Sequence, residues 1–178
     1  HPRICEQIKM TMSQILSCAI DDKLIYENVA KKVTLPKRHK KERRALTDLE
    51  KEAIKKADFT LQEQAFIMLL FYFGLRRGEA LALSRHDIDL KKKILFVNKT
   101  VIFDKNNPII KIGAKSDAGN REIPVPESVT AFLRGFLKSS DTFYLFPGKH
   151  TETLSKTQYV KMWDRIIRKM NDAVTSER

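Results

Sequence analysis

The stretch "LQEQAFIMLLFYFGLRRGEALAL" (61–83) restricts the fold more than any other segment of the chain. Its first thirteen residues are mostly apolar, which predicts a largely buried helix over residues 61–73. Gly74 predicts the end of this helix, because glycine readily takes the left-handed conformation that closes helices. Residues 76–84 predict a second, short helix. The segment therefore places two adjacent arginines, Arg76 and Arg77, at the end of a buried helix.

Further helices are expected on both sides of this segment. Apolar residues recur at helical spacing over residues 3–20, and a short second helix is expected within "DDKLIYENVAKKV". "TDLE" predicts a capping box in which Thr47 and Glu50 satisfy each other's backbone N–H groups, so a helix should run from there to about Ala57. Two more amphipathic helices are expected over "ESVTAFLRGFLKS" and "TQYVKMWDRIIRKM".

Three β-rich segments lie between these helices. They are residues 93–103, 108–112 and 121–126. Their short connections predict a small three-stranded antiparallel meander, with "GAKSDAGN" (113–120) as the hairpin loop between the second and third strands. The fold class expected is α+β, mostly α: a helical domain with a small three-stranded antiparallel sheet.

Charge indicates the class of partner. The chain carries 34 Lys and Arg against 22 Asp and Glu, a net charge of +12, which favours nucleic acid first and an anionic membrane surface second. No apolar run approaches the ~18 residues of a membrane span, and no signal peptide precedes the first helix, so we expect a cytoplasmic protein. The four histidines are scattered and no acidic cluster occurs, so no metal or cofactor is expected.

The block "PKRHKKERR" (36–44) contains no apolar residue and reads as a basic linker. Runs of one charge are often only solvated. They also bind phosphates, and the net charge of the rest of the chain favours that second interpretation. The residues expected to contact DNA are Lys37, Arg38, Lys40, Lys41, Arg43 and Arg44.

Two features could act on a phosphate: the Arg76–Glu79 pair and Lys115. Glu79 lies three residues after Arg76, close enough on a helix to hold its guanidinium in one orientation, although such a pair can equally be a surface ion pair that contributes less than about 1 kcal/mol. Lys115 is expected at the tip of the hairpin loop, where it could reach a groove or give a proton to a departing alkoxide. A loop lysine can also be no more than exposed surface.

Taken together, these motifs resemble the tyrosine recombinase (phage integrase) family, over essentially the whole chain. In that family a G-[LM]-R-x-x-E segment precedes L-x-x-x-D-I-D, and a hairpin lysine precedes an R-x-I-P strand; here they read "GLRRGE", "LSRHDID", "K" and "REIP". The resemblance implies the end of a core-binding domain over residues 1–35, a linker over 36–44 and a catalytic domain (the DNA breaking-rejoining core) over 45–178. One departure is Asn28-Val29, where the family's junction usually has Asn-Pro.

The resemblance also implies roles and partners. Arg76 matches the arginine that holds the scissile phosphate, Lys115 the general acid for the leaving 5′ oxygen, and Glu79 the acidic brace. Arg121 is expected among the DNA-binding residues. Family members recombine double-stranded DNA through a 3′-phosphotyrosine intermediate and assemble as tetramers on paired sites. No metal is needed, because fixed arginines stabilise the transition state.

The family's remaining catalytic groups are not found in the sequence: the His-x-x-Arg box, a later His or Trp, and the nucleophilic tyrosine. Tyr72 and Tyr144 are expected in the core, and Tyr159 beside Trp163 is expected to pack rather than react. We therefore expect a piece of a longer recombinase, monomeric and unable to cleave DNA alone. The alternatives are a non-catalytic DNA-binding module or regulator on the same scaffold, and a basic scaffold that binds RNA or other partners.

Overall fold

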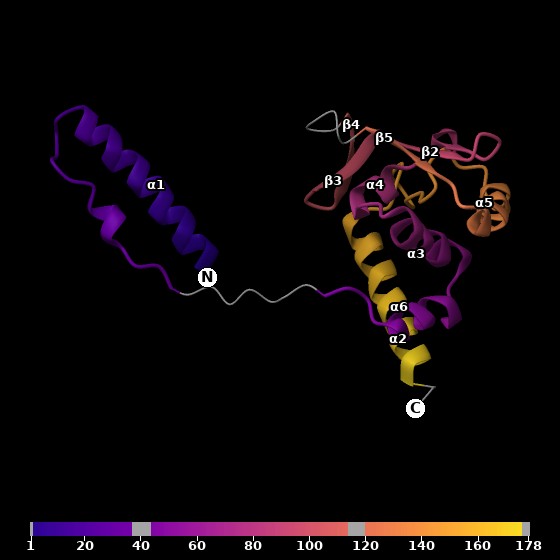
Figure 1. Ribbon diagram of the computed structural model, residues 1–178. Coiled ribbons are helices and arrows are strands. Elements are labelled where there is room, and N and C mark those ends of the chain that lie inside the picture. The colour runs from indigo at the N-terminus through magenta and orange to yellow at the C-terminus, as the bar shows by residue number, and fades with distance from the viewer. Residues whose placement is uncertain (1, 37–43, 114–119, 176–178) are drawn as a thin grey trace. The chain divides into compact units, whose positions relative to one another are not determined.

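The computed structural model describes residues 2–36, 44–113 and 120–175 (Figure 1). The chain forms two compact units, His1–Ala45 and Leu46–Arg178, which are described separately. Six of the site residues expected from the sequence lie outside the described residues: Lys37, Arg38, Lys40, Lys41, Arg43 and Lys115.

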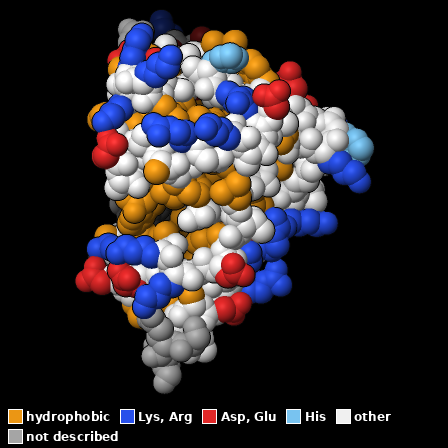
Figure 2. Space-filling view, turned by 90° about the vertical axis from the view of Figure 1, so that its right-hand side faces the viewer, with side chains coloured by type: hydrophobic (Ala, Val, Ile, Leu, Met, Phe, Trp, Pro, Cys, Tyr) orange, Lys and Arg blue, Asp and Glu red, His pale blue; other side chains and the backbone are white. Residues whose placement is uncertain are grey.

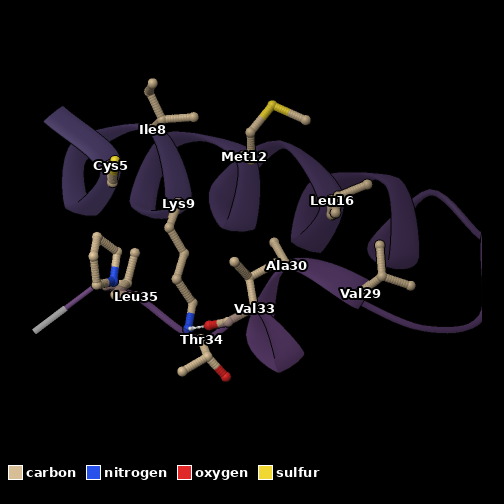
Figure 3. A pocket seen from close by; sticks show the side chains of 11 residues that line it. Cys5, Ile8, Lys9, Met12, Leu16, Val29, Ala30, Val33, Thr34 and Leu35 are labelled. Atoms are coloured by element: carbon tan, nitrogen blue, oxygen red, sulfur yellow. Dashed lines mark hydrogen bonds between the residues drawn. The ribbon is translucent and has the colours of Figure 1, made fainter. Parts of the chain in front are cut away.

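The first unit is one long helix with a short segment packed along it. Helix α1 spans Pro2–Asp21, and the short second helix expected after it is only a 3-10 turn, η1, over Val29–Lys32. The turn stays short because its flanks are tied to α1. The Asn28 side chain donates to the Ser13 carbonyl (2.8 Å), and Lys9 donates to the carbonyl of Val33, which is already extended (2.7 Å; Figure 3).

This first unit keeps much of its apolar surface in solvent. A shallow apolar pocket lies between α1 and the returning segment (Figure 3). On α1 itself, Ile4, Ile8, Met12 and Ile15 are 46–58% exposed.

The second unit contains five α-helices among its described residues. They are α2 (Asp48–Lys56), α3 (Leu61–Phe73), α4 (Arg77–Ala82), α5 (Glu127–Ser139) and α6 (Lys156–Thr175). The predicted capping box is confirmed: the Thr47 amide donates to Glu50 (2.8 Å) and the Glu50 amide donates to Thr47 Oγ1 (3.2 Å). Gly74 ends α3 with φ +60°, as predicted.

The described strands are β1 (Ile88–Asp89), β2 (Ile94–Val97), β3 (Lys99–Asp104), β4 (Asn107–Ile112) and β5 (Arg121–Pro124). A three-stranded antiparallel sheet is present, but its order is β1-β2-β5, while β3 and β4 form a separate two-stranded ribbon. The expected pairing of residues 93–103 with 108–112 is confirmed, but residues 121–124 pair with 94–97, so the expected pairing of the second strand with the third is wrong.

The length of the β3–β4 hairpin explains why β5 pairs with β2 and not with β4. Its tight turn at Lys105 and Asn106 returns β4 along β3 only as far as Lys99, which pairs with Ile112. Gly113, at φ +83°, then donates to the Asn98 carbonyl (2.8 Å), and β5 pairs with β2 beginning at Val97. Residues 113–120 thus connect the β3–β4 ribbon to the three-stranded sheet, and β4 and β5 are not paired with each other.

The core of the second unit lies between the helices and the sheet. The fully buried side chains come from several elements of the unit: Phe66 of α3, Leu81 of α4, Leu95 of β2, Leu133 of α5, Ile166 of α6, and Phe146 from the segment between α5 and α6. Helix α6 runs from the β3–β4 ribbon past α3 to α2 (Figure 1). Its start is held to the ribbon by Asn106, whose side chain accepts from the amide (2.9 Å) and hydroxyl (2.8 Å) of Thr157.

The tyrosines only partly follow the sequence prediction. Tyr159 is buried and its ring packs against Phe66 and Trp163, as predicted. Tyr144 is half-buried. Tyr72 is 43% exposed and packs edge-on against Phe71, so its assignment to the core is wrong. Because α3 is apolar on every side, its sequence pattern could not indicate which face points outward.

Apolar and basic groups also share the surface. Figure 2 shows apolar side chains gathered in the middle of one face, with Lys and Arg side chains above and below them. An apolar groove of about 300 Å³ lies between α2, α3 and α6 and includes Phe71 and Trp163. Within the described ranges, no helix is long and apolar enough to cross a membrane.

Candidate active site

Arg76 is positioned by the three residues that join α3 to α4. Gly74 turns the chain in the left-handed conformation, and Leu75 is buried in the core with 5% of its surface exposed. Arg76 follows as the extended residue immediately before α4, and its side chain is 80% exposed. Because Leu75 is buried, it fixes the backbone position of Arg76. The guanidinium of Arg76 stays exposed, so its donors are accessible to a ligand.

Glu79 holds Arg76 from within the first turn of α4. Its carboxylate is buried, with 6% of the residue exposed, and Oε1 accepts from Arg76 Nη1 at 2.8 Å. Oε2 accepts from the Arg76 backbone amide at 2.9 Å. The contact predicted from the i,i+3 spacing is therefore confirmed, and it is more than a surface ion pair because the carboxylate is desolvated.

Arg121, the first residue of β5, completes this cluster. Its Nη2 donates to Glu79 Oε2 at 2.8 Å and its Nη1 donates to Oε1 at 3.3 Å, and its side chain is 30% exposed. No local signal could reveal this contact, because the two residues are 42 positions apart. It depends on β5 pairing with β2, which the expected meander did not include.

The electrostatics of the cluster favour an anion. Burial by itself raises the pKa of the Glu79 carboxyl, but the hydrogen bonds from Arg121 and from the amide and side chain of Arg76 lower it to about 2. The carboxylate is thus ionised at neutral pH, where two guanidiniums share one negative charge. The surplus positive charge lies with the exposed Arg76, where a phosphate can reach it.

Lys115 lies outside the described residues, but the residues on both sides of its loop are described. Gly113 is hydrogen-bonded to Asn98, and Arg121 pairs with Val97 in the ladder. Both ends of the loop therefore meet the chain where β2 gives way to β3. One of these ends carries the guanidinium that contacts Glu79.

The neighbouring Arg77 has a different environment. Its guanidinium lies 5.3 Å from the ring centroid of Tyr159 and 5.6 Å from that of Phe103. These cation–π contacts link α4 to α6 and to the β3–β4 ribbon. The two adjacent arginines thus separate into one that contacts Glu79 and one that packs on aromatic rings.

The close approach of α4 to β3 helps to position the residues of this site. A Cβ atom on Gly78 would lie 2.5 Å from Thr100 Oγ1 and 2.7 Å from the Val101 carbonyl oxygen. Only glycine fits there without a shift of helix or strand. This contact sets the distance between α4, which carries Glu79, and β3, which directly follows β2, the strand that pairs with β5 and Arg121.

A second buried carboxylate, which the sequence did not indicate, fixes α3. Glu63 is 1% exposed and accepts from Arg165 Nε and Lys169 Nζ of α6, each at 2.8 Å. It also accepts from the Thr60 amide at 3.0 Å. Burial raises its pKa, but Lys169, Arg165 and the Thr60 amide together lower it to about 2. Its two cationic partners lie about one hundred residues further along the chain, so local sequence gives no signal for them.

Among the residues that the structure describes, no group of three His, Cys, Asp or Glu residues is placed to hold a metal ion.

Comparisons with known proteins identify the family. The family model described as "Phage integrase family" matches residues 38–177. A protein described as "Tyrosine recombinase XerC-like", from Caldanaerobacter subterraneus subsp. tengcongensis, is 26% identical over 84% of this chain. The chain spans 46% of that relative's length.

Solved structures show the same fold. The Tn1549 transposon integrase in complex with circular intermediate DNA gives a TM-score of 0.74 at 19% identity, over 94% of this chain and 58% of the other. XerA recombinase gives a TM-score of 0.53 at 24% identity, over 80% of this chain and 46% of the other. With the family model covering nearly all of the second unit, these matches lead to one conclusion: the chain belongs to the phage integrase family of tyrosine recombinases.

Proposed function

We propose that this chain is the part of a site-specific DNA recombinase that binds double-stranded DNA and holds the scissile phosphate, for the integration or excision of a phage or other mobile element. The observation that carries the proposal is the exposed Arg76 guanidinium, held in one orientation by a buried, ionised Glu79. A guanidinium fixed before the reaction stabilises the extra negative charge of a pentacoordinate phosphate without reorganising.

In this proposal each residue has a distinct role. Arg76 binds the non-bridging oxygens of the phosphate, and Glu79 keeps the guanidinium in place. Lys115, two residues after the anchored Gly113, protonates the departing 5′ oxygen. The attacking group is a tyrosine that forms a 3′-phosphotyrosine, and none of Tyr26, Tyr72, Tyr144 and Tyr159 is assigned to it.

The 178 residues alone are proposed to bind DNA without cutting it. Their proposed DNA contacts lie in the basic linker: Lys37, Arg38, Lys40, Lys41, Arg43 and Arg44. The whole recombinase would act as a tetramer on two paired sites, while this piece would be monomeric. A second candidate is a DNA-binding regulator on the same scaffold.

The reading frame beyond Arg178 separates these two candidates. A His-x-x-Arg box followed by a tyrosine supports the enzyme, and a stop codon directly after Arg178 supports the regulator.

For the enzyme, the decisive test is strand cleavage by the whole recombinase on a nicked duplex that carries the end of its element. We expect Arg76→Ala and Lys115→Ala each to abolish the covalent protein–DNA adduct while binding of the same duplex changes little. Arg77→Ala, which removes the neighbouring guanidinium, should still form the adduct. If binding is lost together with cleavage in Arg76→Ala, the catalytic assignment is wrong.

A further inference from the structure

We infer that Arg121 is a positioning residue rather than a phosphate ligand: it fixes the Glu79 carboxylate, which in turn orients Arg76. This inference rests on the proposed function for its catalytic consequence. Its structural part, the control of Arg76 through Glu79, can be tested without any reaction.

The contacts of Arg121 point inward. Both of its terminal nitrogens donate to Glu79, one to each carboxylate oxygen, in the paired geometry that suits a guanidinium and a carboxylate. Its side chain is 30% exposed, whereas that of Arg76 is 80% exposed. Of the two arginines on Glu79, Arg76 is therefore the one whose donors remain open to a phosphate.

The chemistry of Glu79 explains why a second guanidinium is needed. Glu79 is buried, and a buried carboxylate stays charged only when opposite charges and hydrogen bonds compensate for lost water. If Arg76 were its single cationic partner, the carboxylate would draw that guanidinium inward. With Arg121 on both oxygens, Glu79 needs only one terminal nitrogen and the amide of Arg76.

The backbone around Arg121 is suited to this role. Arg121 pairs with Val97 at the end of the β2–β5 ladder, and β3, which follows directly, packs against α4 at Gly78. The positions of Arg121 and Glu79 are thus set by two packed elements rather than by a free loop. The same residue also ends the loop that contains Lys115, so Arg121 links the two proposed catalytic residues.

The first test uses the 178-residue chain labelled for NMR. In Arg121→Gln we expect the side-chain carboxyl signal of Glu79 to titrate at higher pH than in wild type, and the Nε–H group of Arg76 to change its order parameter. Lys111→Gln, which removes an exposed charge from β4 in the separate two-stranded ribbon, should change neither. Arg121→Lys keeps the positive charge but loses the paired donors of the guanidinium. Its Glu79 and Arg76 signals should lie between those of wild type and those of Arg121→Gln. Unchanged Glu79 and Arg76 signals in Arg121→Gln would overturn the inference.

The second test uses the same variants with a 40-base-pair duplex of mixed sequence. A phosphate ligand contributes about 0.9 to the slope of log affinity against log salt concentration. We expect Arg121→Gln to leave this slope at the wild-type value. A decrease of about 0.9 in Arg121→Gln would instead identify Arg121 as a phosphate ligand.

The third test is cleavage by the whole recombinase on its nicked duplex. A misplaced catalytic group costs on the order of 100-fold in rate, so we expect a loss of that size in Arg121→Gln, with partial recovery in Arg121→Lys. Cleavage by Arg121→Gln at the wild-type rate would contradict the inference. Failure of the wild-type protein to cleave would count against the proposed function instead, and the NMR test would still decide the role of Arg121.

Discussion

Glu63 and Glu79 are two nearly fully buried carboxylates with the same construction. Each lies in the first turn of a helix, accepts from a backbone amide three residues earlier and contacts two cationic side chains. Such a carboxylate contributes to stability only while its partners remain, because a buried charge without compensation costs several kcal/mol. One cluster joins α3 to α6, and the other joins α4 to β5.

These carboxylates make the stability of the second unit sensitive to acid. The pKa of Glu63 falls from an ordinary 4.5 to about 2 on folding. Because the folded state has the lower pKa, this stabilisation is fully present above about pH 4.5 and is lost as the pH falls toward 2. At 1.36 kcal/mol per pKa unit the loss is about 3 kcal/mol.

Glu63→Gln tests this directly. We expect the variant to be less stable than wild type at pH 7, and to lose less free energy of unfolding between pH 5 and pH 3, as measured by urea unfolding. The exposed Glu122, changed to Gln, is the control and should retain the wild-type pH dependence. Equal pH dependence in all three proteins would show that Glu63 does not cause the loss of stability in acid.

At the scale of elements, the contact of α4 with β3 depends on one missing side chain. Gly78→Ala would put a Cβ within 2.7 Å of the backbone oxygen of Val101, so helix or strand must move. We expect a loss of about 1–3 kcal/mol in the free energy of unfolding, in the range of other overpacked cores. Gly135→Ala, in α5 with no atom within 4 Å, should instead stabilise by about 0.5–1 kcal/mol.

Chemical denaturation of the two variants gives the comparison. A destabilised Gly135→Ala would mean that helix propensity does not decide the sign there. An unchanged Gly78→Ala would mean that α4 can move from β3 at no cost, and the positions of Glu79 and Arg121 would then not be set by this contact.

The elements differ in how well the sequence predicts them. The α3 boundary at Gly74, the Thr47–Glu50 capping box and the Arg76–Glu79 pair were predictable, because each is decided by residues within a few positions of one another. The pairing of β5 with β2 was not, because it depends on how far β4 returns along β3. The Arg121–Glu79 contact follows from that pairing, and the Glu63–Arg165 contact follows from the packing of α6 on α3, so the site was predicted only in its local half.

At the scale of the whole molecule, net charge and local charge have to be distinguished. The surplus of +12 includes cations that already face carboxylates, such as Lys51 beside Asp48 and Lys55 beside Glu52. Such a pair presents little net field to a phosphate. The block 36–44 contains six Lys and Arg against one Glu, so its sequence carries a surplus of positive charge.

This distinction predicts which lysines and arginines bind DNA. Neutralising Lys37, Arg38, Lys40 and Lys41 to Gln in the 178-residue chain should weaken binding to a mixed-sequence duplex and lower the salt slope by up to about 3.6, or 0.9 for each DNA phosphate that is no longer neutralised. Neutralising Lys32, Lys51 and Lys55, which each face a carboxylate, is the control and should change the slope much less. Fluorescence anisotropy titrations between 50 and 200 mM salt, roughly the range over which such interactions are screened, give both slopes. If the slope falls equally per charge removed in the two variants, total charge rather than the linker binds the DNA, and the linker only joins the two units.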